Sequence, residues 1–178
     1  MKKLCMILPL ALILCFMIGC QDKEAMAELE AMKAQAEVEE QNKALATRYN
    51  EAWESGDLEA VKEIFSPDFV FHSQSGQDNS LEDTIYALKQ HMVTWPDRTF
   101  SVEDMFVKGD KIARMTTFRA THTVDVKGLP ATGKKVEIRS MDIIRIENGK
   151  IVEMWNVEDN LTFFKQLGFE LKLKEGER

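Results

Sequence analysis

The spacing of hydrophobic residues changes between Thr94 and Thr99, from a helical to a strand-like pattern. Before this point apolar residues recur every three or four positions, as in Leu81, Ile85 and Leu88, which predicts helices. After it, apolar and polar residues alternate through long runs, which predicts strands. The chain is therefore expected to fold as an α+β domain in which helices precede an antiparallel sheet.

The N-terminal half predicts helices and one short strand. Residues 21–56 contain good helix formers, no proline and a single glycine at the end, and they predict one long helix. We interpret its first half as a solvated stalk, and the alternatives are a coiled coil or partial disorder. In its second half, Tyr49 and Trp53 are expected to pack inward. The remaining elements are a helix at Leu58–Phe65, a strand at Asp68–His72, a polar loop at Ser73–Ser80 and a helix at Leu81–Thr94 with Ser80 as N-cap.

The C-terminal half predicts a four-stranded meander. Asn148-Gly149 is a strong hairpin signal because both residues tolerate positive φ. Strands joined by such short turns pair antiparallel, and helices on one face of the sheet would leave a concave pocket. The predicted strands are Thr99–Val107, Ile112–Val126, Lys135–Ile146 and Ile151–Glu158.

The last predicted strand places an aromatic ring and a carboxylate on one face. In a regular strand, Ile151, Glu153, Trp155, Val157 and Asp159 lie on the same side of the sheet. Asp159 also precedes an amphipathic helix at residues 160–167, where it is well placed to act as the N-cap.

The first twenty residues form a targeting segment. Lys2 and Lys3 precede an apolar run at Leu4–Ile18 that is short for a membrane span, and the run ends in Gly19-Cys20. This pattern resembles a bacterial lipobox, in which Cys20 is lipidated and becomes the new N-terminus. The alternatives are an uncleaved anchor or an ordinary signal peptide. We therefore expect a protein of the bacterial cell envelope, outside the cytoplasm, anchored to a membrane through lipid.

Composition and charge argue against some classes of function. The net charge of −7 becomes −9 when residues 1–19, which hold two lysines and no acid, are removed, and an acidic body argues against nucleic acid as a partner. Cys5, Cys15 and Cys20 all lie in the targeting segment, so the mature domain has no disulfide or catalytic thiol. The predicted organisation is a signal peptide at 1–19, a stalk at 20–41, a domain at 42–172 and a polar tail at 173–178.

Several kinds of site lack their sequence signature. The histidines are scattered without metal-ligand spacing, so no metal site is expected. No glycine-rich phosphate loop opens a helix, and no Gly-x-Ser-x-Gly elbow occurs. No cofactor is therefore predicted.

Between residues 42 and 170 the chain resembles the SnoaL-like polyketide cyclases, also called ester cyclases, of the nuclear-transport-factor-2-like superfamily. The resemblance rests on short motifs in the family's order, together with the final hairpin and helix. It implies a cone-shaped fold, with helices packed on a curved antiparallel sheet. The motifs are Tyr49–Trp53, Gly56-Asp57-Leu58, Ser66–His72, Trp95-Pro96-Asp97, Gly109–Ile112, Ala120-Thr121-His122, Gly128–Lys134 and Gln166-Leu167-Gly168.

The resemblance also implies an acid/base site. A carboxylate near the end of the last strand, here Asp159, would remove a proton α to a carbonyl before ring closure by an aldol step. Trp155 would supply apolar surface, and neutral His122 could bind a carbonyl or enolate oxygen. The alternatives are a structural N-cap for Asp159 and a strand-end role for His122.

Weaker candidates for substrate binding complete the predicted site. His72 follows an apolar strand and could face the pocket mouth, and Arg139 could pair with Asp159 or with a substrate carboxylate. His91 reads mainly as packing, and Trp95 stands in the family's aromatic-Pro-Asp corner. The expected function is binding of a small hydrophobic carbonyl compound, with or without cyclisation. The alternative is a non-catalytic ligand-binding or protein-interaction module, which could form a homodimer.

Overall fold

The computed structural model describes residues 4–125, 129–170 and 172, with side chains from residue 23 onward. The chain divides into two compact units, Met1–Glu40 and Gln41–Arg178. The predicted signal peptide at 1–19 and the predicted lipidation residue Cys20 lie outside the described side chains. Within the described residues, no helix has the length and apolar character needed to cross a membrane.

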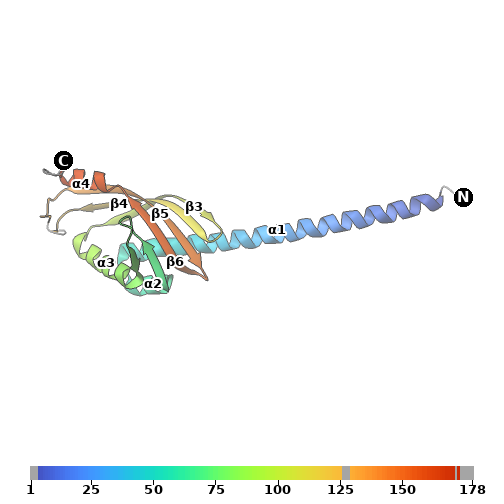
Figure 1. Ribbon diagram of the computed structural model, residues 1–178, viewed down its shortest axis with the longest axis horizontal. Helices are drawn as coiled ribbons and strands as arrows, with labels where there is room; N and C mark the ends of the chain where they lie inside the picture. Colours follow the sequence, from blue (N-terminus) through green and yellow to red (C-terminus); the bar gives the residue numbers. More distant parts are fainter. Residues whose placement is uncertain (1–3, 126–128, 171, 173–178) are drawn as a thin grey trace, which may run out of the picture. The chain divides into compact units, whose positions relative to one another are not determined.

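The first unit is formed by the N-terminal part of one long helix. Helix α1 spans Leu4–Ser55, so it begins earlier than the predicted start at residue 21 (Figure 1). Its apolar residues Met26, Leu29 and Met32 are all exposed. The described side chains of this unit have no buried face in the single chain, and the predicted stalk stays a prediction.

The predicted short helices are confirmed, and capping explains where they begin. Helix α2 spans Leu58–Ile64, α3 spans Leu81–Thr94 and α4 spans Asn160–Leu167. Asp57 caps α2, and Ser80 with Asp83 forms a capping box on α3. Helix α2 ends one residue earlier than predicted because Phe65 is already extended and begins a strand.

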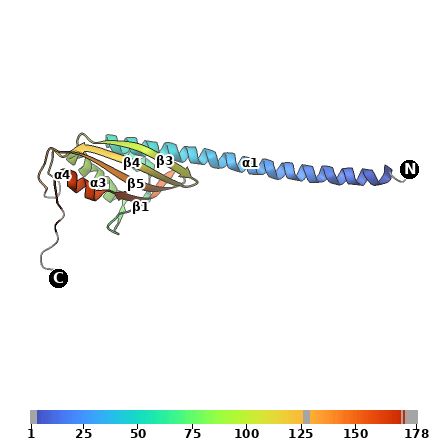
Figure 2. The ribbon, with the colours of Figure 1, turned by 90° about the horizontal axis from the view of Figure 1, so that it is seen from above.

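The second unit contains a six-stranded sheet with the order β2-β1-β6-β5-β4-β3. The predicted antiparallel meander of the last four strands is confirmed, and Figure 2 shows β3, β4 and β5 side by side. Strand β1, however, runs parallel to β6, so the sheet is mixed. The strands are β1 Phe65–His72, β2 Asp78–Ser80, β3 Thr99–Lys108, β4 Lys111–Thr121, β5 Lys135–Glu147 and β6 Lys150–Glu158.

Two further segments differ in extent from the prediction. The predicted polar loop at Ser73–Ser80 contains strand β2, which pairs with the end of β1. Strand β4 ends at Thr121 instead of Val126, because the backbone of His122 turns to pair with Lys134 and Gly133.

A bulge in β6 corrects the predicted face of this strand. Asn148 and Gly149 both take positive φ in the hairpin turn, as predicted. After the turn Ile146 pairs with Ile151, but Arg145 pairs with Glu153, so β6 carries one extra residue. Because side chains alternate with a period of two, the extra residue moves Trp155 to the face opposite Ile151. The prediction that Ile151 and Trp155 share one face is therefore wrong.

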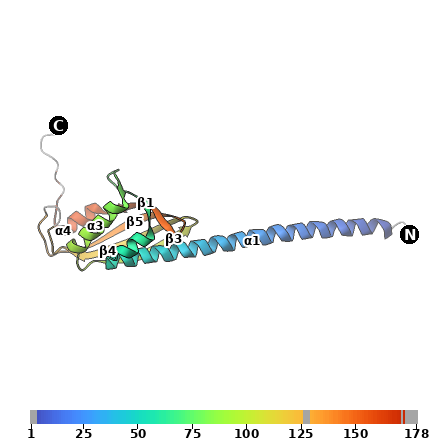
Figure 3. The same cartoon turned by 90° about the horizontal axis from the view of Figure 1, so that it is seen from below.

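The helices cover one face of the sheet, called here the inner face. Figure 3 shows α3 lying over the strands on this side, and α2 contacts β1 and β6. The main hydrophobic core lies between the helices and the strands and includes Tyr49, Phe65, Leu88, Ile144 and Met154. A second cluster, centred on Trp95 and Leu167, lies near α4.

Candidate functional site

Two rows of polar side chains cross the inner face of the sheet from β4 to β6. Strand register places Arg114, Asp142 and Asn156 in one row. The next row holds Thr116, Ser140 and Glu158. These positions alternate with core residues such as Ile144 and Met154, so the sheet presents polar groups where an ordinary core would be apolar.

The first row is held by a buried ion pair. Arg114 Nε donates to Asp142 Oδ2 at 2.9 Å, and the side chains are only 4% and 6% exposed. Asn156 Nδ2 donates to Asp142 Oδ1 at 2.7 Å, so both carboxylate oxygens accept a hydrogen bond. Arg114 Nη1 is buried and has no hydrogen-bond partner among the described residues. A buried guanidinium N–H without an acceptor is costly, and it marks a place where a ligand oxygen would be stabilised.

Both rows open into a cavity of about 290 Å³ between the sheet and the helices. Aromatic residues from α1, β1 and β3 form much of its wall, while α3 and β2 add polar groups. Concave sites with apolar walls and a few converging polar groups are typical of small-molecule binding. The wall consists of Tyr49, Asn50, Trp53, Phe65, Phe71, Asn79, Asp83, Thr84, Ala87, Phe100 and Met154.

Tyr49 packs against the ion pair. The Arg114 guanidinium carbon lies 4.7 Å from the centre of the Tyr49 ring. The hydroxyl group donates to Met154 Sδ at 3.8 Å. Burial raises the pKa of Tyr49 to about 12, so the ring stays a neutral phenol at physiological pH.

Glu158 is the unpaired carboxylate of the cavity. Among the described residues no hydrogen bond or ion pair reaches its carboxyl group. The residue is exposed at the rim, yet desolvation of its carboxyl group raises its pKa, and the negative charge of Asp142 adds to the rise. A carboxyl group with a raised pKa that faces a cavity is a stronger base than an ordinary glutamate and is a candidate for proton transfer.

Asp83, also on the cavity wall, behaves differently. Ser80 donates to its carboxylate through both the side-chain hydroxyl and the backbone N–H. These hydrogen bonds lower the pKa of Asp83, with the hydroxyl contributing most. Asp83 therefore stays charged and holds the start of α3.

The structure places Asp159 outside the cavity. Its Oδ1 accepts a hydrogen bond from Thr162 N at 3.0 Å, which makes Asp159 the N-cap of α4. This backbone hydrogen bond is the main cause of a lowered pKa for Asp159. The predicted general acid/base needs a raised pKa, so the geometry favours the alternative reading of this residue as a helix cap.

His122, Trp95 and His91 come together in an aromatic cluster beside α4 that does not line the cavity. His122 is fully buried, 5.5 Å from Trp95 between ring centres, and its Nδ1 lies 3.1 Å from Thr132 Oγ1. The His91 ring lies 5.1 Å from Phe118, and burial lowers the pKa of His91 to about 4, with the charge of Arg98 adding to the effect. In the structure His91 packs among aromatic rings, and its predicted role in substrate binding stays a prediction.

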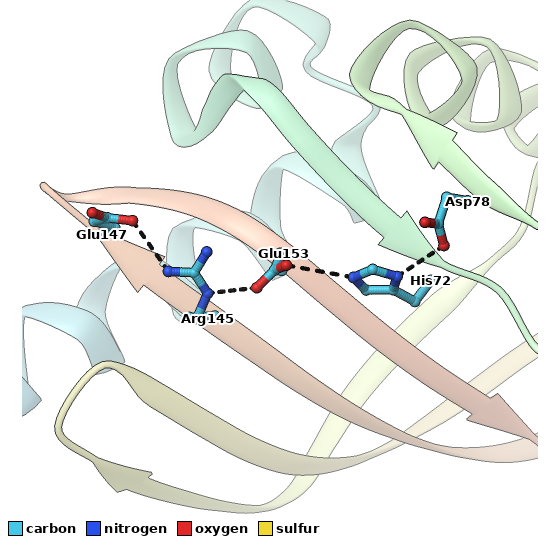
Figure 4. A network of polar contacts seen from close by, with 5 residues as sticks. All are labelled: His72, Asp78, Arg145, Glu147 and Glu153. Carbon is cyan, nitrogen blue, oxygen red and sulfur yellow. Dashed lines mark hydrogen bonds and ion pairs between the residues drawn. The ribbon is translucent and has the colours of Figure 1, made fainter.

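His72 and Trp155 stack on each other away from the cavity, with 4.6 Å between ring centres. Figure 4 shows His72 between two carboxylates, with Nδ1 2.8 Å from Asp78 Oδ1 and Nε2 3.6 Å from Glu153 Oε1. Arg145 extends this network from Glu153 to Glu147 (Figure 4). The network ties β1, β2, β5 and β6 together at their outer surface.

Arg139 also lies outside the cavity. Its side chain is exposed on β5, and its backbone carbonyl accepts a hydrogen bond from Asp159 N at 3.2 Å. None of the residues that the sequence analysis assigned to the site lines the cavity. Within the described ranges, no cluster of His, Cys, Asp or Glu has the geometry of a metal site.

Comparison with known proteins identifies the family. A family model described as SnoaL-like polyketide cyclase matches residues 43–167. The chain belongs to the SnoaL-like polyketide cyclase family. The predicted α+β, nuclear-transport-factor-2-like fold is thereby confirmed, with the correction that the sheet is mixed.

Solved structures support this membership. IdmH from Streptomyces antibioticus, a proposed polyketide cyclase, is 31% identical, with a TM-score of 0.67 over 72% of this chain and 99% of IdmH. AclR from Streptomyces galilaeus, a proposed hydroxylase, is 26% identical, with a TM-score of 0.69 over 77% of this chain and 91% of AclR. The comparison with curated proteins finds no significant match.

The cavity residues of this SnoaL-like domain left a signal in the sequence that the motif comparison overlooked. In β5, Ser140 and Asp142 lie on the same face as the buried residues Ile138 and Ile144. In β4, Arg114 lies on the same face as the buried residue Ile112. Polar residues at core positions of a strand indicate function. The position of Glu158 could not be predicted from alternation alone, because the bulge in β6 reverses the face that a regular alternation predicts.

Proposed function

We propose that this protein is a lipid-anchored member of the family that binds a small hydrophobic carbonyl compound in the cavity below Arg114. The proposal includes cofactor-independent acid/base chemistry of the aldol type, in which a proton α to a carbonyl is removed and a ring closes. Aromatic walls suit a planar ligand, and the paired polar rows supply a few oriented hydrogen-bonding groups.

One observation carries this proposal, namely the buried Nη1 of Arg114 that lacks an acceptor. Asp142 holds the guanidinium through Nε, so the orientation of Nη1 is fixed before any ligand arrives. A carbonyl oxygen placed there would gain a charge-assisted hydrogen bond, and the bond would strengthen as the oxygen became an enolate.

The binding part is tested with 2-tetralone, a bicyclic aromatic ketone with acidic α-hydrogens. The full-length chain is titrated with this ketone by NMR, beside Arg114→Lys and Asp159→Asn variants. Lysine keeps a positive charge next to Asp142 but has no second nitrogen for the ligand, so we expect binding to weaken roughly 10-fold or more. Asp159→Asn is the control, because asparagine caps a helix as well as aspartate does. Equal binding by the wild type and Arg114→Lys would contradict the proposal.

The location is a separate part of the proposal. Lys2, Lys3, the apolar run and Gly19-Cys20 support cleavage before Cys20 and attachment of lipid to that residue. Intact-mass measurement of the protein extracted from bacterial membranes should show loss of residues 1–19 and addition of a lipid. Cys20→Ala should remove both changes. An unmodified N-terminus in the wild type would contradict lipid anchoring.

A second candidate function is an interaction through the outer face of the sheet. Met141 and Val157 pair across β5 and β6 and are each 64% exposed, with Ile143 beside them. Exposed apolar side chains on neighbouring strands are typical of interaction surfaces. A second copy of the chain would bury the same patch on both subunits, which is the arrangement of a two-fold dimer.

A further inference from the structure

We propose that Glu158 is the catalytic acid/base of this site, the residue that takes the α-proton from the bound carbonyl compound and later returns it. This inference rests on the proposed function and names a residue for its chemical step. It replaces Asp159, its neighbour in the chain, in that role.

The other carboxylates of the cavity already accept hydrogen bonds from neighbouring residues. Asp142 accepts hydrogen bonds on both oxygens, from Arg114 and Asn156, which stabilise its charged form. Asp83 accepts two hydrogen bonds from Ser80 and completes the capping box of α3. A carboxylate whose charge is stabilised in this way is a weak base. Glu158 alone among them has no such partner within the described part of the chain.

Strand register places Glu158 at a suitable distance from the oxygen-binding group. Glu158 pairs with Ser140, one row along from the Arg114–Asp142–Asn156 row, on the same face. Arg114 lies two strands away on β4, about 10 Å across the sheet at the backbone. Long side chains from both strands can then contact one small molecule, with the carbonyl oxygen at Arg114 and the α-carbon near Glu158. Thr116 and Ser140 lie between them and bond each other at 2.7 Å.

The electrostatics of the pair agree with this division of roles. Desolvation raises the pKa of the Glu158 carboxyl group, and the charge of Asp142 raises it further. Asp142 is held in place by hydrogen bonds from Arg114 and Asn156, whereas the Glu158 carboxyl group has no such partner among the described residues and is available to a ligand. Two carboxyl groups in different environments of one cavity are a recurring arrangement in acid/base sites.

The proposed step balances without a cofactor. The Glu158 carboxylate takes the α-proton, the C–H electron pair becomes the enolate double bond, and the carbonyl oxygen takes the negative charge next to Arg114 Nη1. The enolate carbon then attacks a second carbonyl carbon of the same molecule, which forms the ring C–C bond. The resulting alkoxide takes the proton from Glu158, which restores the carboxylate and gives a cyclic hydroxy ketone.

The test follows deuterium uptake at the α-carbons of 2-tetralone in heavy water by proton NMR, with the full-length chain. Glu158→Gln should reduce the protein-catalysed exchange about 100-fold or more, while the dissociation constant for 2-tetralone changes less than about threefold. Asp159→Asn is the matched control, adjacent in the chain and outside the cavity, and should exchange at the wild-type rate. Exchange that survives Glu158→Gln would overturn the role of Glu158 and leave the proposed function standing. If the wild type binds the ketone but does not exchange it, the acid/base chemistry and the role of Glu158 both fail.

A second measurement does not depend on turnover. The side-chain carboxyl carbon of Glu158 is followed by carbon-13 NMR through a pH titration, in the wild type and in Asp142→Asn. We expect Glu158 to titrate above an ordinary glutamate, and to titrate lower once the charge of Asp142 is removed. A titration at the ordinary position in both proteins would overturn the inference, even if 2-tetralone binds.

Discussion

Glu158 and Asp159 are consecutive residues whose carboxyl groups occupy opposite kinds of environment. Glu158 ends β6 at the cavity, where desolvation and Asp142 raise its pKa. Asp159 begins α4, where hydrogen bonds from Thr162 lower its pKa. One residue thus has the properties of a proton carrier, and the next has those of a structural cap.

This difference predicts opposite effects of amide substitution on stability. A carboxyl group whose pKa is higher in the folded state stabilises the fold at low pH, and that contribution is lost as pH rises through the folded pKa. Glu158→Gln should therefore raise the free energy of unfolding relative to wild type at pH 8 and have little effect at pH 4. The free energies are measured by urea unfolding of the full-length chain at both pH values.

Asp159→Asn is the comparison for that experiment. Its lowered pKa stabilises the fold above the pKa of an unfolded aspartate, near 4, and that contribution is lost as pH falls through the lower folded pKa. The asparagine variant should therefore be no more stable than wild type at pH 8. A gain in stability at pH 8 from Asp159→Asn, with none from Glu158→Gln, would reverse the assignment of the two environments.

The buried ion pair makes a separate prediction about folding. Arg114→Met leaves the Asp142 carboxylate buried without its cation, which should cost about 3–5 kcal/mol of unfolding free energy. The double variant Arg114→Met/Asp142→Leu removes both charges and should recover most of that loss. Urea unfolding of the wild type, both single variants and the double variant gives the coupling between the two residues. If the two single losses simply add in the double variant, the pair is not coupled in the way proposed.

The sequence predicted the fold much better than the site. Local signals decide most elements: Ser80 and Asp159 are caps, Asn148-Gly149 takes positive φ, and α3 and α4 have the predicted ends. The parallel pairing of β1 with β6 is a long-range contact that no local pattern encodes. The face of Trp155 was wrong because one bulge residue reverses an alternation.

The cavity could be predicted only in part, for a related reason. Arg114 and Asp142 stand out as charged residues at core positions of strands, so their burial could have been expected. Their contact depends on the register between β4 and β5, which pairs residues 28 positions apart in sequence. The family motifs instead directed attention to His122 and Trp95, which pack into the aromatic cluster. The roles predicted for these residues stay predictions.

We predict that the chain forms a dimer through the outer face of the sheet and that charged residues on this face would separate the two subunits. Lysines at Met141 and Val157 would place four cations against each other in a two-fold interface, because each subunit contributes the same patch. Sedimentation of the full-length chain in mild detergent should show a dimer for wild type and a monomer for Met141→Lys/Val157→Lys. Val93→Lys is the control, since Val93 is 67% exposed on α3, away from this face, and should leave the dimer intact. A wild-type monomer would rule out this second candidate function.

The lowered pKa of His91 leads to a prediction about how the stability of the protein changes in mild acid. Burial lowers its pKa from 6.5 in the unfolded chain to about 4 in the folded protein, with the positive charge of Arg98 as a second cause. Between these values the unfolded chain binds a proton that the folded protein does not, so stability is lost as pH falls from 6.5 towards 4. The loss from this residue is at most about 3.5 kcal/mol, since the two pKa values differ by about 2.5 and each unit of pKa corresponds to about 1.4 kcal/mol. His91→Phe keeps an aromatic ring beside Phe118 and removes the titrating group. The stability of this variant relative to wild type should therefore increase steadily as the pH falls from 6.5 towards 4. Thermal unfolding at half-unit pH steps measures the difference, with exposed Tyr86→Phe on the same helix as control. Parallel pH curves for wild type and His91→Phe would show that His91 is protonated as easily in the folded protein as in the unfolded chain.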